Sequence, residues 1–437
     1  MSLGLSSMSS YTSGKRSPKQ PWHLNKSEAP RVTKEITVLG AGIAGCTTAV
    51  ALARRGLQVR VIDRHQTAGC EGSGNSQAIV YPKLSSRDDV LPRVNLASMK
   101  FASRYYKPFW QQGFGDQCGV LVLPENNKVL NDFKTIGQRF DNEPALVGLH
   151  KNAELCALSG IKLQAELGLY FPELGWLPPA EICRELLAHW QIPLISADIH
   201  NISNTDNYWQ LIDANGDLCL TSESLVVANA FDCLNFEQTD FLPMTQLRGQ
   251  VTDLPANQKT RALKTVICGE GYITPQNNGL HSCGATYNKG VFTTELRDSD
   301  HQANLGQMAA TDPGLGAAIG PQNLANLSGR ANYRCTTKDY LPIVGPVPNV
   351  SQLLEDYAPL RRDARSDISS LGSYVPNLYI NCGMGSRGLS YAPLTAEILA
   401  GEIAGEFDRE QPLLDSDLRL AMHPARFLIR DLKKNRI

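Results

Sequence analysis

A glycine turn near the start of the chain restricts the possible folds more than any other feature of the sequence. Gly40, Gly42 and Gly45 (Gly-Ala-Gly-Ile-Ala-Gly) follow a run typical of a strand, residues 35–39, and precede small residues typical of a helix, residues 46–55. Between a strand and a helix, such glycines let backbone amides at the helix start approach a diphosphate. The turn therefore predicts a phosphate-binding βαβ unit.

An acidic residue at a suitable distance makes this interpretation more specific. Asp63 follows the next predicted strand, residues 58–62, about 20 residues after the turn. A carboxylate there accepts hydrogen bonds from the ribose hydroxyls of an adenosine, and an aspartate, unlike a basic residue, disfavours a phosphorylated ribose. We therefore predict a dinucleotide site and regard a purely structural tight turn as the less favoured alternative.

A second glycine turn near the other end of the chain helps to choose the dinucleotide. It lies between a predicted strand, residues 378–381, and a predicted helix, residues 392–403. Its candidate cofactor-binding residues are Gly383, Gly385, Ser386, Arg387 and Gly388. NAD and FAD share the first turn, but a second positive helix end can stabilise negative charge on a reduced flavin. The pair of turns therefore predicts FAD, whereas the second turn alone is also typical of an ordinary helix start.

The pattern along the chain predicts an α/β fold with a discontinuous Rossmann-like domain and a second, mixed α+β domain. Helical spacing covers residues 90–109 and 178–190, and residues 224–230 are typical of a buried parallel strand. Residues 240–345 instead contain short strand-like runs divided by Gly, Pro and Asn. The expected FAD-binding domain comprises 35–85, 175–240 and 370–410, the substrate domain 86–174 and 241–369, the flexible leader or linker remnant 1–34, and the basic C-terminal extension 411–437.

Composition limits the class of protein. The 437 residues exceed what one core of roughly 250 to 300 residues supports. A hydrophobic content of 42% and a formal charge of -1 indicate a soluble globular protein, so any RNA contact must come from a local patch. No apolar run approaches the ~20 residues that span a bilayer, and we expect a cytoplasmic protein. The eleven scattered cysteines lack a Cys-x-x-Cys pair, which argues against a structural metal or disulfides.

Several short motifs recur in a known family. They are residues 72–77 (GSGNSQ), 248–251 (RGQV), 271–275 (GYITP), 284–287 (GATY), 334–345 (RCTTKDYLPIVG) and 383–392 (GMGSRGLSYA). From residue 34 onward the chain resembles the FAD-dependent oxidoreductase domain of the MnmC family, the bifunctional tRNA 5-methylaminomethyl-2-thiouridine biosynthesis proteins. The resemblance implies the glutathione reductase or D-amino-acid oxidase type of fold, shared with glycine and sarcosine oxidases.

The resemblance also implies a reaction. This family domain oxidises the carboxymethylaminomethyl group on the wobble uridine of tRNA, which leaves an aminomethyl group and releases glyoxylate. A methyltransferase partner, either a domain or a separate protein, then acts on the product. No methyltransferase-like glycine loop precedes Gly40, so we expect FAD-dependent oxidation at a CH–NH bond without methyl transfer, from a monofunctional protein or a fragment of a bifunctional one.

The chemistry of an N-CH2-COO⁻ substrate suggests which side chains to consider. The carboxylate needs an anchor, and the planar fork of an arginine suits it. By resemblance Arg334 is the first candidate, with a structural pairing to Asp339 as the alternative. Lys83 and Arg387 are secondary candidates for the carboxylate or the flavin edge, with a solvated surface charge as the alternative for each.

Three side chains with hydrogen-bonding groups fall in the predicted substrate domain. Tyr272, Tyr287 and His281 could contact the amine or the water that hydrolyses the imine, although each residue is more often a packed core or edge residue.

Two further segments are assigned mainly by resemblance or charge. Gly74, Asn75 and Gln77, with Ser76 between them, correspond to the family loop that wraps the FAD diphosphate and ribityl chain. A short amphipathic helix is expected within residues 426–436, whose cations either contact tRNA phosphates or form a solvated face. Other cations considered for phosphate contacts are Lys83, Arg87, Arg361 and Arg362.

Two other functions remain open. A small-molecule amine or amino-acid oxidase of the glycine, sarcosine or D-amino-acid type would use the same fold and flavin without RNA. A non-catalytic, flavin-bearing tRNA-binding module would retain tRNA but leave the flavin oxidised.

Overall fold

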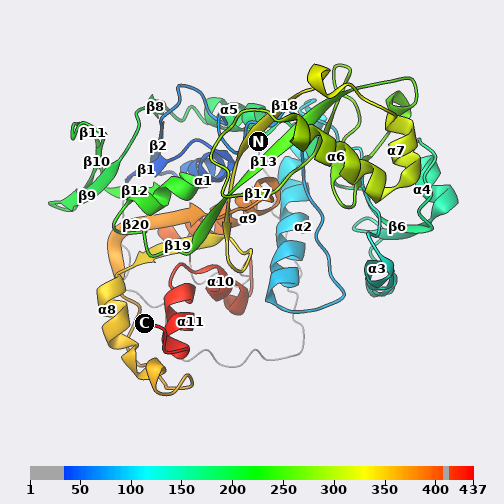
Figure 1. Ribbon diagram of the computed structural model, residues 1–437. Helices are drawn as coiled ribbons and strands as arrows, with labels where there is room; N and C mark the ends of the chain where they lie inside the picture. Colours follow the sequence, from blue (N-terminus) through cyan, green and yellow to red (C-terminus); the bar gives the residue numbers. More distant parts are fainter. Residues whose placement is uncertain (1–33, 407–412) are drawn as a thin grey trace.

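The computed structural model describes residues 34–406 and 413–437 (Figure 1). The predicted leader, apart from Lys34, lies outside the described residues, as does part of the boundary between the predicted FAD-binding domain and the C-terminal extension. Within the described part of the chain, no helix combines the length and apolar character needed to cross a membrane.

The first sheet has the strand order β19-β20-β12-β1-β2-β8, and its strands come from both ends of the chain. Its strands are β1 (Glu35–Leu39), β2 (Gln58–Asp63), β8 (Leu194–Ser196), β12 (Ser224–Val227), β19 (Ile343–Pro348) and β20 (Tyr374–Cys382). All neighbours pair in parallel except β19, which runs antiparallel to β20. The four residues of β12 are all buried, as expected for an inner parallel strand covered on both faces. The predicted α/β class is confirmed.

Helices from distant parts of the sequence pack together on this sheet. They are α1 (Ile43–Ala53), α2 (Val90–Gln111), α5 (Pro179–His189) and α9 (Gly388–Ile403). Helix α1 contacts both α9 and α5, and α2 contacts α9. The predicted helix at residues 392–403 begins earlier, at Gly388, because the peptide N–H of Tyr391 already donates to the carbonyl of Arg387.

The second sheet is mostly antiparallel and has the order β17-β13-β16-β15-β14-β4-β6-β5, with β18 also paired to β13. Its strands are β4 (Val120–Val122), β5 (Gly148–Lys151), β6 (Leu167–Phe171), β13 (Met244–Pro255), β14 (Val266–Cys268), β15 (Tyr272–Ile273), β16 (Leu280–Gly284), β17 (Asn288–Lys289) and β18 (Ser328–Thr337). The predicted change of character after residue 240 therefore corresponds to a second sheet. The helices of this region are α3 (Asn127–Arg139), α4 (Asn152–Ser159), α6 (Asp298–Thr311) and α7 (Pro313–Ile319).

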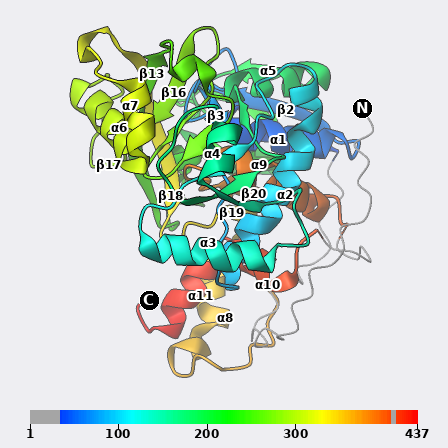
Figure 2. The same ribbon diagram turned by 90° about the vertical axis from the view of Figure 1, so that its right-hand side faces the viewer.

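Smaller elements complete the described structure. They are the strands β3 (Ala78–Ile79), β7 (Trp176–Leu177), β9 (Asn201–Thr205), β10 (Tyr208–Ile212) and β11 (Leu218–Ser222), the helices α8 (Val350–Asp356), α10 (Ser416–Met422) and α11 (Arg426–Lys433), and short 3-10 turns at Ala230–Asn235, Thr260–Ala262, Leu324–Asn326 and Ala358–Arg361. Figure 2 shows α8, α10 and α11 at the opposite end of the molecule from α6 and α7.

The C-terminal helix is fixed to the body of the protein. Helix α11 buries Phe427 and Leu432. Arg426 binds both carboxylate oxygens of Asp339, with Nε and Nη2 at 3.1 and 3.0 Å. Burial in this pair lowers the pKa of Arg426, and Asp339 opposes the shift. At least this cation of the C-terminal segment therefore has an internal role, because a guanidinium with a bidentate partner is not free for a phosphate.

Candidate active site

The first glycine turn is so tight that two of its glycines cannot carry a side chain. Gly40 has a φ of +111°, and a Cβ on it would lie 2.6 Å from the carbonyl oxygen of Ala228. A Cβ on Gly45 would lie 1.8 Å from the carbonyl oxygen of Gly40. Gly42 differs, since the nearest atom to its Cβ would be Ser73 Oγ at 3.4 Å. The turn therefore brings α1 close to β1 and leaves the side of Gly42 open.

The start of α1 fits an anionic ligand. The N-cap residue is Gly42, which has no side chain to bond the first amides of the helix. The first turn contains no acidic residue. The N–H of Ile43 donates to Ser73 Oγ at 3.0 Å. Because no carboxylate of α1 neutralises the positive helix end, the site is suited to a diphosphate.

Asp63 lies beside this turn at the end of β2. Its Oδ2 accepts the N–H of Ala41 at 2.7 Å, and its Oδ1 accepts the N–H of His65 at 2.9 Å. These bonds fix the orientation of the carboxylate, and each oxygen keeps a lone pair for another donor. The geometry fits the role predicted for Asp63 toward a ribose.

The second turn lies against the first. Gly383 and Gly385 have φ values of +74° and +57°, and the N–H of Gly385 donates to the carbonyl of Cys335 at 2.8 Å. A Cβ on Gly388 would lie 3.1 Å from Cγ2 of Ile43, so the starts of α9 and α1 meet. Two positive helix ends thus converge, as the sequence predicts for FAD.

The loop formed by residues 70–77 is held by a residue that the sequence analysis did not single out. Arg330 Nη2 donates to the carbonyls of Cys70 and Glu71, and a Cβ on Gly74 would lie 2.5 Å from Arg330 Cζ. Gln77 is buried, and its side-chain amide donates to the carbonyl of Pro275 at 3.0 Å. Within this loop Asn75 is half-buried. The sequence signal that could have identified Arg330 is strand alternation. Residues four apart on β18 share one face, so Arg330 lies on the same face as Arg334.

Arg334 has the geometry expected of an anion anchor. Its guanidinium lies 4.5 Å from the centre of the Tyr287 ring, and Nη1 donates to the carbonyl of Thr286 at 2.9 Å. A Cβ on Gly249 would lie 2.0 Å from Nη1, so the glycine provides the space for the guanidinium. Among the described residues no carboxylate forms an ion pair with Arg334, and the alternative partner Asp339 is bound by Arg426. Several donors of Arg334 therefore remain available for a substrate carboxylate.

Two further predicted cations lie in the same region. Arg387 Nη1 donates to Tyr391 Oη at 3.0 Å and to Asn95 Oδ1 at 3.4 Å. Desolvation and the neighbouring charge of Arg387 lower the pKa of Lys83, although Lys83 is an exposed residue. The influence of Tyr287 is opposite and raises the pKa of Lys83. The charges of Arg387 and Tyr287 thus both act on Lys83, which is consistent with the three side chains lying in one region of the site.

Tyr272 and His281 occupy different environments. Burial raises the pKa of Tyr272 to about 12, and the nearby charge of Arg334 opposes that shift, so this phenol lies close to the candidate anchor. The ring of His281 is buried with Nδ1 against the carbonyl of Thr274 and Nε2 against Thr260 Oγ1. Both of its nitrogens are occupied, which assigns His281 to the core of the second sheet.

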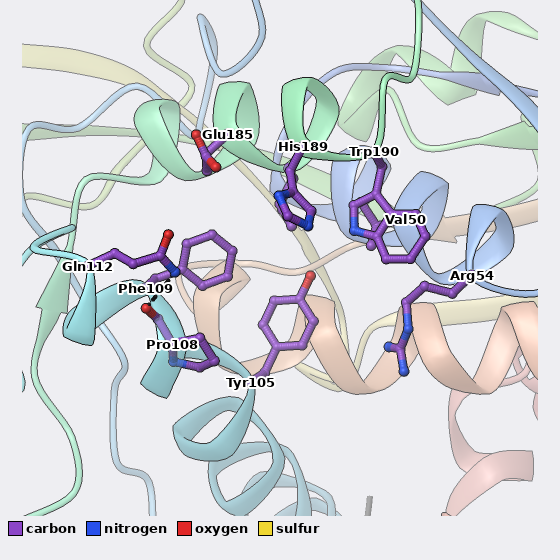
Figure 3. A pocket seen from close by; sticks show the side chains of 10 residues that line it. Val50, Arg54, Tyr105, Pro108, Phe109, Gln112, Glu185, His189 and Trp190 are labelled. Atoms are coloured by element: carbon purple, nitrogen blue, oxygen red, sulfur yellow. Dashed lines mark hydrogen bonds between the residues drawn. The ribbon is translucent and has the colours of Figure 1, made fainter. Parts of the chain in front are cut away.

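A separate pocket of about 50 Å³ lies outside this region, between α1, α2 and α5 (Figure 3). Its lining includes Val50, Tyr105 and Trp190 and none of the candidate site residues. Across residues 34–406 and 413–437, no group of three or more His, Cys, Asp or Glu side chains is placed to hold a metal ion.

The paired glycine turns on a parallel sheet, with an arginine and a tyrosine presented from a second sheet, define the class of flavin-dependent oxidoreductases. The family model described as FAD dependent oxidoreductase matches residues 35–402, and the chain belongs to this family.

Individual relatives of the chain within this family share one name. The chain is 38% identical over 420 residues to the tRNA 5-methylaminomethyl-2-thiouridine biosynthesis bifunctional protein MnmC of Pseudomonas putida (strain GB-1), covering 95% of this chain and 62% of that protein. The protein of the same name from Pseudomonas aeruginosa is 37% identical over 418 residues, with coverage of 94% and 62%. This chain thus spans about six-tenths of the length of these curated relatives.

Among solved structures, glycine oxidase from Geobacillus kaustophilus has the same fold. It superimposes with a TM-score of 0.67 at 16% sequence identity, covering 90% of this chain and 99% of that one.

Proposed function

We propose that the chain binds FAD without a covalent link. The diphosphate would lie at the starts of α1 and α9, the adenosine ribose at Asp63, and the loop of residues 70–77 along the cofactor. Two features support this placement. The space beside Gly42 is open, and the starts of α1 and α9 meet. Bound FAD would supply a two-electron acceptor.

Acid precipitation tests this form of binding. We expect the purified protein to release its flavin into the supernatant, because noncovalent contacts are lost on unfolding, and the released compound to be FAD. Flavin retained in the pellet, or NAD released in its place, would contradict the assignment.

The Asp63→Lys variant should retain much less FAD. The substitution removes an acceptor for the ribose and the oxygen that binds the N–H of Ala41, and it puts a cation beside the adenosine. Flavin content is compared with thermal melting in excess FAD, so that a cofactor defect is distinguished from a folding defect. Wild-type flavin content would show that Asp63 does not contact the ribose.

We further propose that the chain oxidises the carboxymethylaminomethyl group on the wobble uridine of tRNA. Loss of a hydride from the methylene carbon and a proton from the nitrogen gives an imine, and addition of water releases glyoxylate and leaves the aminomethyl nucleoside. Arg334 would hold the substrate carboxylate, with Lys83 or Arg387 as a second cation, and Tyr272 would hydrogen-bond near the amine.

The observation that carries this proposal is Arg334, a guanidinium placed against Tyr287 with no carboxylate partner among the described residues. The names of the MnmC relatives supply the tRNA context. A methyltransferase acting on the product would be its functional partner, and a tRNA substrate favours the cytoplasm.

Anaerobic mixing with tRNA that bears the carboxymethylaminomethyl uridine tests the reaction. We expect loss of the oxidised-flavin absorbance and formation of glyoxylate. Reduction by free glycine, sarcosine or a D-amino acid instead would indicate a small-molecule oxidase, and tRNA binding without reduction would indicate a non-catalytic module.

A further inference from the structure

Three exposed aromatic side chains lie on segments that border the candidate site. Tyr287, Phe292 and Tyr340 are 59%, 77% and 62% exposed, and Phe292 is the most exposed of the large apolar residues in the described chain. We call these three residues the aromatic rim. Large apolar groups grouped on a surface are typical of a contact surface, and the proposed FAD placement leaves them unused.

The register of the second sheet places the rim beside Arg334. Strands β17 and β18 flank β13, and Lys289 and Arg334 both pair with Leu247. Figure 1 shows β17 against β13. Phe292 follows β17 by three residues, and Tyr340 follows β18 by three residues. Both side chains therefore project from segments that leave the same end of the sheet.

Tyr340 is held in a costly conformation. Its φ of +61° lies in the left-handed region, which is unfavourable for an L-residue with a bulky side chain. The turn is fixed on both sides, since Asp339 binds Arg426 and the carbonyl of Tyr340 accepts from Tyr391 Oη at 3.4 Å. The fold thus maintains an exposed aromatic ring at a position where glycine or asparagine would be less strained.

The charge around the rim favours a polyanion. Lys83, Lys289 and Lys338 are exposed, and none of them forms an ion pair with another described residue. The opposite faces of Tyr287 differ, because one is covered by Arg334. Cations interleaved with exposed aromatic rings are the arrangement by which proteins bind single-stranded nucleic acid, through phosphate contacts and base stacking.

We propose that the aromatic rim is a stacking platform for unpaired RNA bases that flank the nucleotide entering the site. Phe292 and Tyr340 would stack on bases adjacent to the modified uridine, and Lys289 and Lys338 would contact the phosphates between them. This inference rests on the proposed tRNA substrate. It adds the requirement that the flanking nucleotides be splayed out of their own stack.

The test compares ring-removing variants with a matched control. Phe292→Ala truncates a side chain that is mostly in solvent, and Tyr340→Asn removes the ring while easing the backbone strain. Tyr208→Ala removes an aromatic residue of similar exposure, 49%, on the separate sheet β9–β11. The probe is an anticodon stem-loop RNA with 2-aminopurine next to the wobble position, and binding is measured by fluorescence titration.

We expect each rim variant to weaken binding about fivefold, because it loses the stacking of one base on an aromatic side chain. The quenching of 2-aminopurine fluorescence should decrease together with the affinity. The Tyr208→Ala control should match the wild type in both measurements. Flavin reduction by the stem-loop relative to the isolated modified nucleoside should fall in the same proportion.

Unchanged affinity and quenching in both rim variants would overturn the proposal. The proposal would also be overturned if the rim variants lost a self-association that sedimentation detects in the wild type while RNA binding stayed intact. The rim would then contact a second copy of the protein. If the wild type binds the stem-loop with quenching but neither RNA nor nucleoside reduces the flavin, the proposed oxidation fails while the platform stands.

Discussion

Replacing Arg334 with lysine is expected to slow flavin reduction by the modified tRNA at least about tenfold. The substitution keeps the charge but removes the planar fork, and losing a charge-assisted hydrogen bond costs ~1.5 to 3 kcal/mol. It also removes the guanidinium that lies on the Tyr287 ring and donates to Thr286. Bound FAD should change little, because Arg334 lies on the substrate side of the proposed site. Anaerobic single-turnover reduction measures the effect.

The matched control is Arg365→Lys, since the side chain of Arg365 is 92% exposed. Filter binding of tRNA by the Arg334→Lys variant should remain strong and steeply salt-dependent, because phosphate contacts dominate that affinity. If reduction is as fast as in the wild type, Arg334 is not the carboxylate anchor, and Lys83 or Arg387 becomes the better candidate.

The Gly249→Ala variant is expected to lose activity on the order of a hundredfold while remaining folded. Its Cβ would lie 2.0 Å from Nη1 of Arg334, so the guanidinium must move, and a displacement of about 1 Å at a positioning group can cost that much. The atom displaced is the end of a flexible side chain, so the free energy of unfolding should change much less than the rate. Flavin reduction and thermal melting measured on the same sample separate the two effects.

Gly306→Ala is the control for this glycine substitution. Gly306 lies within α6, and a Cβ there would meet no atom within 4 Å, so alanine should stabilise the helix slightly. Full activity in Gly249→Ala would show that Arg334 has room to shift without consequence, and would weaken its assignment as the anchor.

The parts of the fold that could be predicted are those determined by local sequence. The two glycine turns, the strand ending at Asp63 and the buried run of β12 each combine a short pattern with a backbone requirement, such as the φ of +111° at Gly40. The antiparallel pairing of β19 with β20 was not predicted, because register between strands depends on residues distant in the sequence.

The environments of individual polar residues could not be predicted from the sequence either. Arg248, in one of the family motifs, is fully buried and binds Asp300 at 2.5 Å and Gln250 at 3.0 Å. A buried arginine is rare unless it is paired, and its partner lies 52 residues further along the chain. Arg330 likewise binds a loop 260 residues away. Strand alternation indicates the face on which Arg330 lies, but the binding partners of both arginines depend on the assembled tertiary structure.

The parallel sheet has a consequence for how the protein acquires its cofactor during synthesis. Strand β12 lies between β1 and β20, so the sheet includes residues from Glu35 to Cys382. Chains are made at about 5 to 20 residues per second, so β20 and the start of α9 leave the ribosome on the order of tens of seconds after β1. Until then the nascent chain has only one of the two converging helix ends. Stable capture of the flavin should therefore follow the synthesis of β20 and the start of α9, and chains stalled before residue 374 should be released without cofactor.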